Sequence, residues 1–95
     1  MVISEELTQR IRISRYRKGV LEKLAQGIKS PRELEIQLNI RLNHISRTLA
    51  QLIELKLVKC LTPNLGRNRL FTITKKGKSV VRKIRGGRVR KLLKE

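Results

Sequence analysis

The chain has 95 residues, of which 24 are Lys or Arg and seven are acidic, giving a formal net charge of +17. This length suits one domain with a modest core, and a hydrophobic content of 39% is too high for a disordered tail. No apolar run reaches the roughly 18 residues of a membrane span, and no signal-peptide core is visible. Cys60 is the single cysteine, so an intrachain disulfide is excluded and a reducing cytoplasm is expected.

The positive charge is concentrated late in the chain. Residues 1–60 carry 12 Lys and Arg against six Glu, a net +6, whereas residues 61–95 carry 12 against Glu95, a net +11. Such a field favours a polyanionic partner. Aromatic residues make up 2% of the chain, so the aromatic-rich amphipathic face of a membrane-surface helix is missing. A nucleic acid is the expected partner and a membrane is not; a basic surface kept for solubility is the alternative.

Two helices are predicted before residue 28. Residues 1–13 are an N-terminal extension whose apolar positions follow a helical spacing, although Ile11-Arg12-Ile13 also suits an extended segment. A core helix follows from Ser14, and Gly27 is its stop signal. Ile28-Lys29 is then a connector or a single β-bridge. The core helix places its apolar residues on one face: Tyr16, Val20, Leu21 and Leu24.

A tight pair of helices is predicted next. Ser30 suits an N-cap, Pro31 suits the first helical position, and Glu33 can close a capping box with Ser30. This short helix ends at a turn over Asn39-Ile40, and a longer helix covers about residues 42–56. The longer helix has an apolar stripe with three- and four-residue steps: Leu42, Ile45, Leu49, Leu52 and Ile53.

The opposite face of the longer helix is rich in hydrogen-bonding side chains. On a helical wheel this face carries Asn43, Arg47, Gln51 and Glu54, with His44 and Ser46 beside it. Arg pairs with guanine edges, and Asn or Gln with adenine edges, in the major groove of DNA. We therefore predict a recognition helix. An ordinary solvated helix face is the alternative.

A β-hairpin is predicted after this helix. Residues 58–61 and 69–73 are rich in strand formers, and the segment between them is rich in Pro, Asn and Gly. Residues 62–69 would form a wing on the DNA minor groove or backbone, because arginines on a projecting loop suit both. The alternative is a solvent-exposed loop. The wing residues expected to contact DNA are Asn64, Arg67, Asn68 and Arg69.

The last predicted helix begins at Thr74, its cap, and runs from Lys75 to about Arg85, where Gly86-Gly87 ends it. Residues 86–95 form a basic tail, either a short helix or a loose arm. The predicted fold is mainly α with a small antiparallel β-hairpin, a winged helix-turn-helix domain over residues 14–85.

This order of elements resembles the winged-helix transcription regulators of the MarR and ArsR type, especially small archaeal ones. The resemblance covers roughly residues 14–84 and is specific for the fold, not for a target. It implies a homodimer that reads two DNA half-sites about one helical turn apart. The motifs that carry it are Ser-Pro-Arg-Glu-Leu at 30–34, Ile-Ser-Arg-Thr-Leu at 45–49, Leu-Val-Lys-Cys-Leu-Thr-Pro at 57–63 and Phe-Thr-Ile-Thr-Lys-Lys-Gly-Lys at 71–78.

The resemblance also implies roles for single residues. It places Asn43, His44 and Arg47 at base edges, and Ser30 and Arg32 near phosphates. Arg41 departs from the family, which usually has a Ser, Thr or Asp cap there. Either Arg41 contacts phosphate or the helix starts later, at Asn43. The predicted DNA-binding set has three parts. The recognition helix supplies Arg41, Asn43, His44, Ser46, Arg47 and Gln51, Ser30 and Arg32 contact the DNA backbone, and the four wing residues complete the set.

Enzymatic and metal-binding functions lack the residues they need. A metal site takes three or four ligands, and the chain has one Cys, one His and no Asp. Cys60 is therefore expected in the core rather than in a sensing site with His44. Gly-rich phosphate loops and paired carboxylates are also missing. We expect no enzyme, no metal, no cofactor and no small-molecule ligand.

Three functions fit the pattern. The first is a sequence-specific regulator of transcription that binds double-stranded DNA in the cytoplasm, at the nucleoid. The second is a ribosomal or RNA-associated winged-helix protein, since the charge is high even for a regulator. The third is an architectural chromatin protein with little sequence preference. Two apolar surfaces are candidates for a homodimer, and packing on the chain's own core is the alternative for both. They are the N-terminal helix, with Ile3, Leu7 and Ile11, and the last helix with its tail, with Val80, Ile84, Val89, Leu92 and Leu93.

Overall fold

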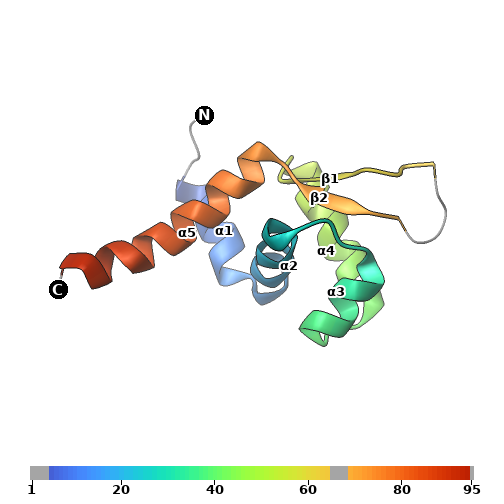
Figure 1. The fold of residues 1–95 in the computed structure, drawn as a ribbon, viewed down its shortest axis with the longest axis horizontal. Helices are drawn as coiled ribbons and strands as arrows, with labels where there is room; N and C mark the ends of the chain where they lie inside the picture. The colour runs from blue at the N-terminus through green and yellow to red at the C-terminus, as the bar shows by residue number, and fades with distance from the viewer. Residues whose placement is uncertain (1–4, 65–68, 95) are drawn as a thin grey trace.

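The computed structural model describes residues 5–64 and 69–94, the side chains as far as residue 85. The described elements confirm a mainly α fold with one antiparallel hairpin (Figure 1). In chain order they are α1 (Glu5–Ile13), α2 (Arg15–Gln26), α3 (Pro31–Leu38), α4 (Leu42–Glu54), β1 (Val58–Cys60), β2 (Phe71–Ile73) and α5 (Lys75–Lys94).

The N-terminal segment is helical from Glu5 and belongs to the core. Ile11 and Thr8 of α1 are buried, and α1 packs against α2 and α5. The extended alternative for Ile11 to Ile13 was wrong, because the helical spacing turns Ile11 inward while Ile13 stays exposed. Ser14 then caps α2 by accepting a hydrogen bond from the Arg17 backbone N–H.

The helix-turn-helix is the region where local sequence signals match the structure most closely. The Ser30 hydroxyl accepts from the Glu33 N–H at 3.2 Å, and a Glu33 carboxylate oxygen accepts from the Ser30 N–H at 2.9 Å. Asn39 ends α3 in the left-handed conformation, with φ 55°. A short polar residue tolerates that conformation, which turns the chain sharply toward α4.

The hairpin is anchored at its base. β1 and β2 pair antiparallel with Lys59 opposite Thr72, and an isolated bridge joins Lys29 to Phe71, as the connector sequence allowed. α4 ends at Glu54 rather than residue 56, because Lys56 takes a positive φ of 67° and turns the chain into β1. Both strands are shorter than predicted at the end toward the loop, because β1 ends at Cys60 rather than residue 61 and β2 begins at Phe71 rather than residue 69.

The base of the hairpin is tied to the start of α5. Thr74 Oγ1 accepts from the Gly77 N–H at 3.1 Å, which confirms the predicted cap, and donates to the Lys56 carbonyl at 2.8 Å. Gly77 lies so close to the Leu57 carbonyl that a Cβ at this position would collide with it. The close approach explains a glycine in the first turn of a helix.

α5 does not stop at the two glycines. It continues through Gly86 and Gly87 to Lys94, so the predicted helix end at about Arg85 was wrong. Glycine weakens a helix by about 1 kcal/mol but leaves its hydrogen bonds in place, and Arg, Lys and Leu on both sides are good helix formers. In Figure 1 the end of α5 lies on the opposite side of the molecule from the hairpin.

Candidate nucleic-acid interface

The solvent-facing ridge of α4 carries polar side chains with hydrogen-bonding capacity. Asn43 and Arg47 are exposed, one helical turn apart, and Arg41 and Ser46 are exposed beside them. The ridge is directed outward because the opposite face is buried in the core: Ile45, Thr48, Leu49 and Leu52. This surface has the donors and acceptors that base edges and phosphates require.

One flank of α4 faces α2 and is engaged there. The ring centroids of Tyr16 and His44 lie 5.2 Å apart at an interplanar angle of 43°. Nε of Arg17 donates a hydrogen bond to Oε1 of Gln51 at 3.1 Å. Two of the predicted DNA-binding residues, His44 and Gln51, are therefore half-buried and in contact with α2, apart from the exposed ridge.

The start of α4 has an unexpected cap. Arg41 is the N-cap residue and makes no side-chain capping bond. Instead, Oε2 of Glu35 on α3 accepts from the Leu42 backbone N–H at 3.2 Å. The helix thus begins at Leu42, and the alternative of a later start at Asn43 was wrong. The Arg41 side chain is exposed and takes no part in capping α4.

At the start of both α3 and α4, a carboxylate accepts a hydrogen bond from a backbone amide. Glu33 accepts from the Ser30 N–H before α3, and Glu35 accepts from the Leu42 N–H at the start of α4. Helix N-termini often bind phosphate through such amides. Here the cationic side chains near these ends, Arg32 and Arg41, are exposed and better placed to meet a phosphate.

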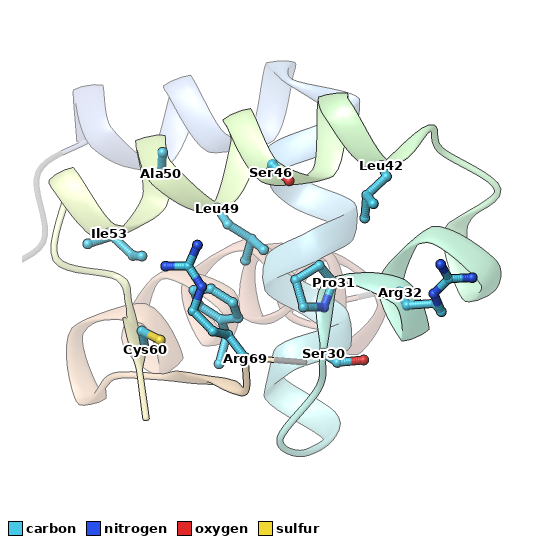
Figure 2. Close-up of a pocket in the computed structure, with 11 residues that line it drawn as sticks. Ser30, Pro31, Arg32, Leu42, Ser46, Leu49, Ala50, Ile53, Cys60 and Arg69 are labelled. Carbon is cyan, nitrogen blue, oxygen red and sulfur yellow. The ribbon is translucent and has the colours of Figure 1, made fainter. Parts of the chain in front are cut away.

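The other flank of α4 borders an open groove of about 560 Å³, which we call the α4–hairpin groove (Figure 2). It separates α4 from the start of α3 and from the hairpin. Arg32 and Arg69 lie toward its opposite ends, with Ser30 and Ser46 as further polar groups. The remaining lining residues are mostly apolar: Pro31, Leu42, Leu49, Ala50, Ile53, Cys60 and Phe71.

The wing is only partly within the described structure. Asn64 and Arg69 are exposed, whereas Arg67 and Asn68 lie outside the described residues. The hairpin base extends past the strands, because Leu61 N–H donates to the Leu70 carbonyl at 2.8 Å. The Leu70 N–H donates to Thr62 Oγ1 at 2.9 Å. This base holds Arg69 at the edge of the α4–hairpin groove.

Cys60 packs against the core from β1 and is half-buried, as a small strand residue would be. Across the described part of the chain, no group of three or more His, Cys, Asp or Glu is gathered as a metal site would require. Within the same residues, no helix is long and apolar enough to cross a membrane.

Sequence reasoning missed three residues that organise this surface: Tyr16, Arg17 and Glu35. The helical spacing predicts Tyr16 on the apolar face of its helix, yet Tyr16 is 38% exposed and contacts His44. Arg17 lies 34 residues from Gln51, so no local pattern joins them. Glu35 had a signal, since the absence of a capping side chain at Arg41 calls for an acceptor from elsewhere.

No protein-family model matches the sequence, and no curated protein matches it. Solved structures match its fold. A MarR family transcription regulator aligns with a TM-score of 0.77 at 24% identity over 94% of this chain and 60% of its own. The transcriptional regulator Tm0710 from Thermotoga maritima aligns at 0.77 and 23% over 94% and 64%. NMB1585, a MarR family regulator from Neisseria meningitidis, aligns at 0.73 and 16% over 90% and 62%.

The fold is therefore the winged helix-turn-helix of MarR-type regulators, as the sequence resemblance implied. The chain spans about three fifths of the length of these structures. In this fold, the ridge of α4 and the hairpin beside it are the parts to consider as a nucleic-acid interface.

Proposed function

We propose that this protein is a regulator of transcription that binds double-stranded DNA, with α4 in the major groove. The observation that carries this proposal is the exposed ridge of Asn43 and Arg47, bordered by a groove that Arg32 and Arg69 line. Asn and Arg are the side chains that pair in a bidentate manner with adenine and guanine. The likeness to MarR-type folds supports the same placement.

The α4–hairpin groove fits the sugar-phosphate backbone between the two DNA grooves. A helix in the major groove and a wing at the neighbouring minor groove must straddle one strand. Arg32, Arg69 and Ser46 would then meet phosphates, and the apolar lining would meet deoxyribose. The wing, including Arg67 and Asn68, would contact the minor groove or the backbone.

Affinity and selectivity come from different residues in this proposal. Lys and Arg supply a salt-dependent attraction through release of counterions, which the net charge of +17 favours. Asn43 and Arg47 supply base preference. If six to eight phosphates are neutralised, the plot of log K against log salt has a slope of about −5 to −7.

We further propose that the chain acts as a homodimer at the nucleoid, in a role that is not enzymatic. α5 extends to Lys94 on the side away from the hairpin. Its last turns carry Val89, Leu92 and Leu93 at helical spacing in the sequence. Light scattering at micromolar concentration should give twice the chain mass of 11.1 kDa. A mass equal to one chain would contradict the dimer.

The first test is selection of bound duplexes from a random DNA library at about 150 mM salt, where non-specific binding is already weak. Enrichment of a short motif, particularly an inverted repeat, is the expected result. Binding without enrichment, which fades as salt rises, would point to an architectural protein. Stronger binding to structured RNA than to duplex DNA at equal phosphate concentration would point to an RNA-associated role.

A further inference from the structure

We propose that Glu35 is a positioning residue of the DNA-binding surface, which fixes the first turn of α4 from the preceding helix and so contributes to base preference. This inference rests on the proposed DNA-binding function. Glu35 is half-buried on α3, and its side chain reaches across the turn to the first residue of α4.

Glu35 bonds to the connecting turn at both its backbone and its side chain. Its carbonyl oxygen accepts from the Asn39 N–H and from the Ile40 N–H, the latter at 3.3 Å. Its carboxylate accepts from the Leu42 N–H at 3.2 Å. One residue thus binds three amides between the end of α3 and the start of α4.

The carboxylate is important because α4 lacks a local cap. The Arg41 side chain offers no acceptor, and no acidic residue lies in the first turn of α4. The positive end of the helix dipole is therefore compensated by Glu35, which is seven residues earlier. Without Glu35, the Leu42 N–H would lose its acceptor, and the first turn would fray more readily in the unbound protein.

Fraying of this turn would move the residues proposed to contact DNA. Arg41 is the N-cap residue, Asn43 lies in the first turn, and both are exposed. DNA would have to order that turn on binding, which lowers affinity for a preferred duplex. Contacts to phosphate tolerate more freedom than contacts to base edges. Loss of Glu35 should therefore reduce discrimination more than it reduces total binding.

The charge of Glu35 acts in the opposite direction. A carboxylate beside the DNA repels phosphate, so its removal should strengthen binding to the preferred duplex and to random duplex by a similar factor. Glu35→Gln separates the two effects, since the amide oxygen can still accept from the Leu42 N–H while the charge is gone. Gln37→Ala is the matched control, because Gln37 is an exposed polar residue of the same helix.

The experiment measures affinity for the selected duplex and for random duplex in five variants: Glu35→Ala, Glu35→Gln, Arg41→Ser, the double variant Glu35→Ala with Arg41→Ser, and Gln37→Ala. We expect Glu35→Ala to lower the ratio of the two affinities by about 2- to 30-fold, the range for a lost N-cap. In Glu35→Gln and Gln37→Ala, the same ratio of affinities should stay within about twofold of its value in the parent chain.

Rescue by a local cap distinguishes positioning from a general structural role. A serine at position 41 would be an N-cap residue whose hydroxyl can accept from the Asn43 or His44 N–H, so it would stabilise the first turn of α4 without replacing the bond to Leu42. In the Arg41→Ser background, Glu35→Ala should therefore cost little discrimination. If Glu35→Ala lowers the melting temperature but leaves the affinity ratio unchanged, or if the serine gives no rescue, the proposal is overturned.

Hydrogen exchange in the free protein tests Glu35 without DNA. The Leu42 amide should exchange faster in Glu35→Ala than in Glu35→Gln or Gln37→Ala. Unchanged exchange at this amide would refute the capping role directly. If the amide responds but no duplex is ever preferred, the capping role stands, whereas the proposed regulator function and the inferred contribution to base preference fail.

Discussion

Both flanks of α4 carry polar side chains, and the flanks differ in what those side chains contact. On the flank toward α2, His44 contacts Tyr16, and Gln51 accepts from Arg17. On the flank toward the hairpin, Ser46 and Ala50 border an open groove. A polar residue on a surface helix is thus available to a ligand only where no neighbouring helix has engaged it.

The ridge between the flanks is expected to give the largest effect. Arg47→Ala should cost about 1–3 kcal/mol of binding free energy at the selected duplex and relax base preference at one position. Titration of that duplex and of its single-base variants measures both. Arg82→Ala on α5 removes an equal charge from a different helix and is the control. An equal loss on every sequence would mean that Arg47 contacts phosphate.

The open flank is expected to show its role through salt. Arg69→Ala should weaken binding to all duplexes alike and reduce the slope of log K against log salt by about one unit. Affinity measured between about 50 and 200 mM salt gives the slope. With Arg82→Ala as the reference again, an unchanged slope for Arg69→Ala would remove Arg69 from the contact surface.

The engaged flank should respond in stability before it responds in binding. Gln51→Ala removes the acceptor of Arg17 and should lower the free energy of unfolding by about 0.5–1.5 kcal/mol. Base preference should not change. Urea unfolding and a repeat of the duplex selection measure the two quantities. A change of preferred base with no loss of stability would show that Gln51 reads DNA, and the two flanks would then be alike.

The ion pair of Glu5 and Lys83 lies away from both flanks of α4 and is expected to give the smallest effect. The hydrogen bond and the positive charge of Lys83, 2.7 Å away, lower the pKa of Glu5 from its usual 4.5. The pair therefore stabilises the folded state when the pH is above the usual pKa of Glu5. This contribution is lost as the pH falls through the lowered pKa.

Glu5→Gln should accordingly lower the melting temperature slightly near pH 7, with DNA binding unaffected. Glu5 is exposed, so solvent screens the pair and the effect is the smallest of the four. Melting curves from pH 7 downward follow it, and the difference from the parent chain should vanish in acid. A difference that grows as the pH falls would mean that another interaction of Glu5 dominates.

Sequence patterns predicted what short-range physics controls. The capping box of Ser30 and Glu33, the turn at Asn39 and the cap at Thr74 each depend on residues a few positions apart. The buried stripe of α4 followed from its spacing in the same way. These features determine the order of the elements and therefore the fold.

Tertiary packing decided what the sequence left open. A helical wheel treats α4 as an isolated cylinder, so it grouped Gln51 with Arg47, although Arg17 from α2 engages Gln51. The glycines at 86 and 87 looked like a stop, yet the helix continues to Lys94 because a weak propensity is not a break. The cap of α4 comes from another helix, which local capping rules do not cover.

The hydrogen bonds of Thr74 affect how much the hairpin loop can vary between proteins of this fold. The Thr74 hydroxyl donates to the Lys56 carbonyl and the Thr74 N–H donates to the Leu57 carbonyl, and these two bonds close the base of the hairpin. Loop closure entropy grows slowly with length, so residues can be added or removed between Thr62 and Leu70 at little cost in stability. The loop of the hairpin can therefore change in sequence and length while the rest of the fold stays the same, which lets the proposed DNA target change.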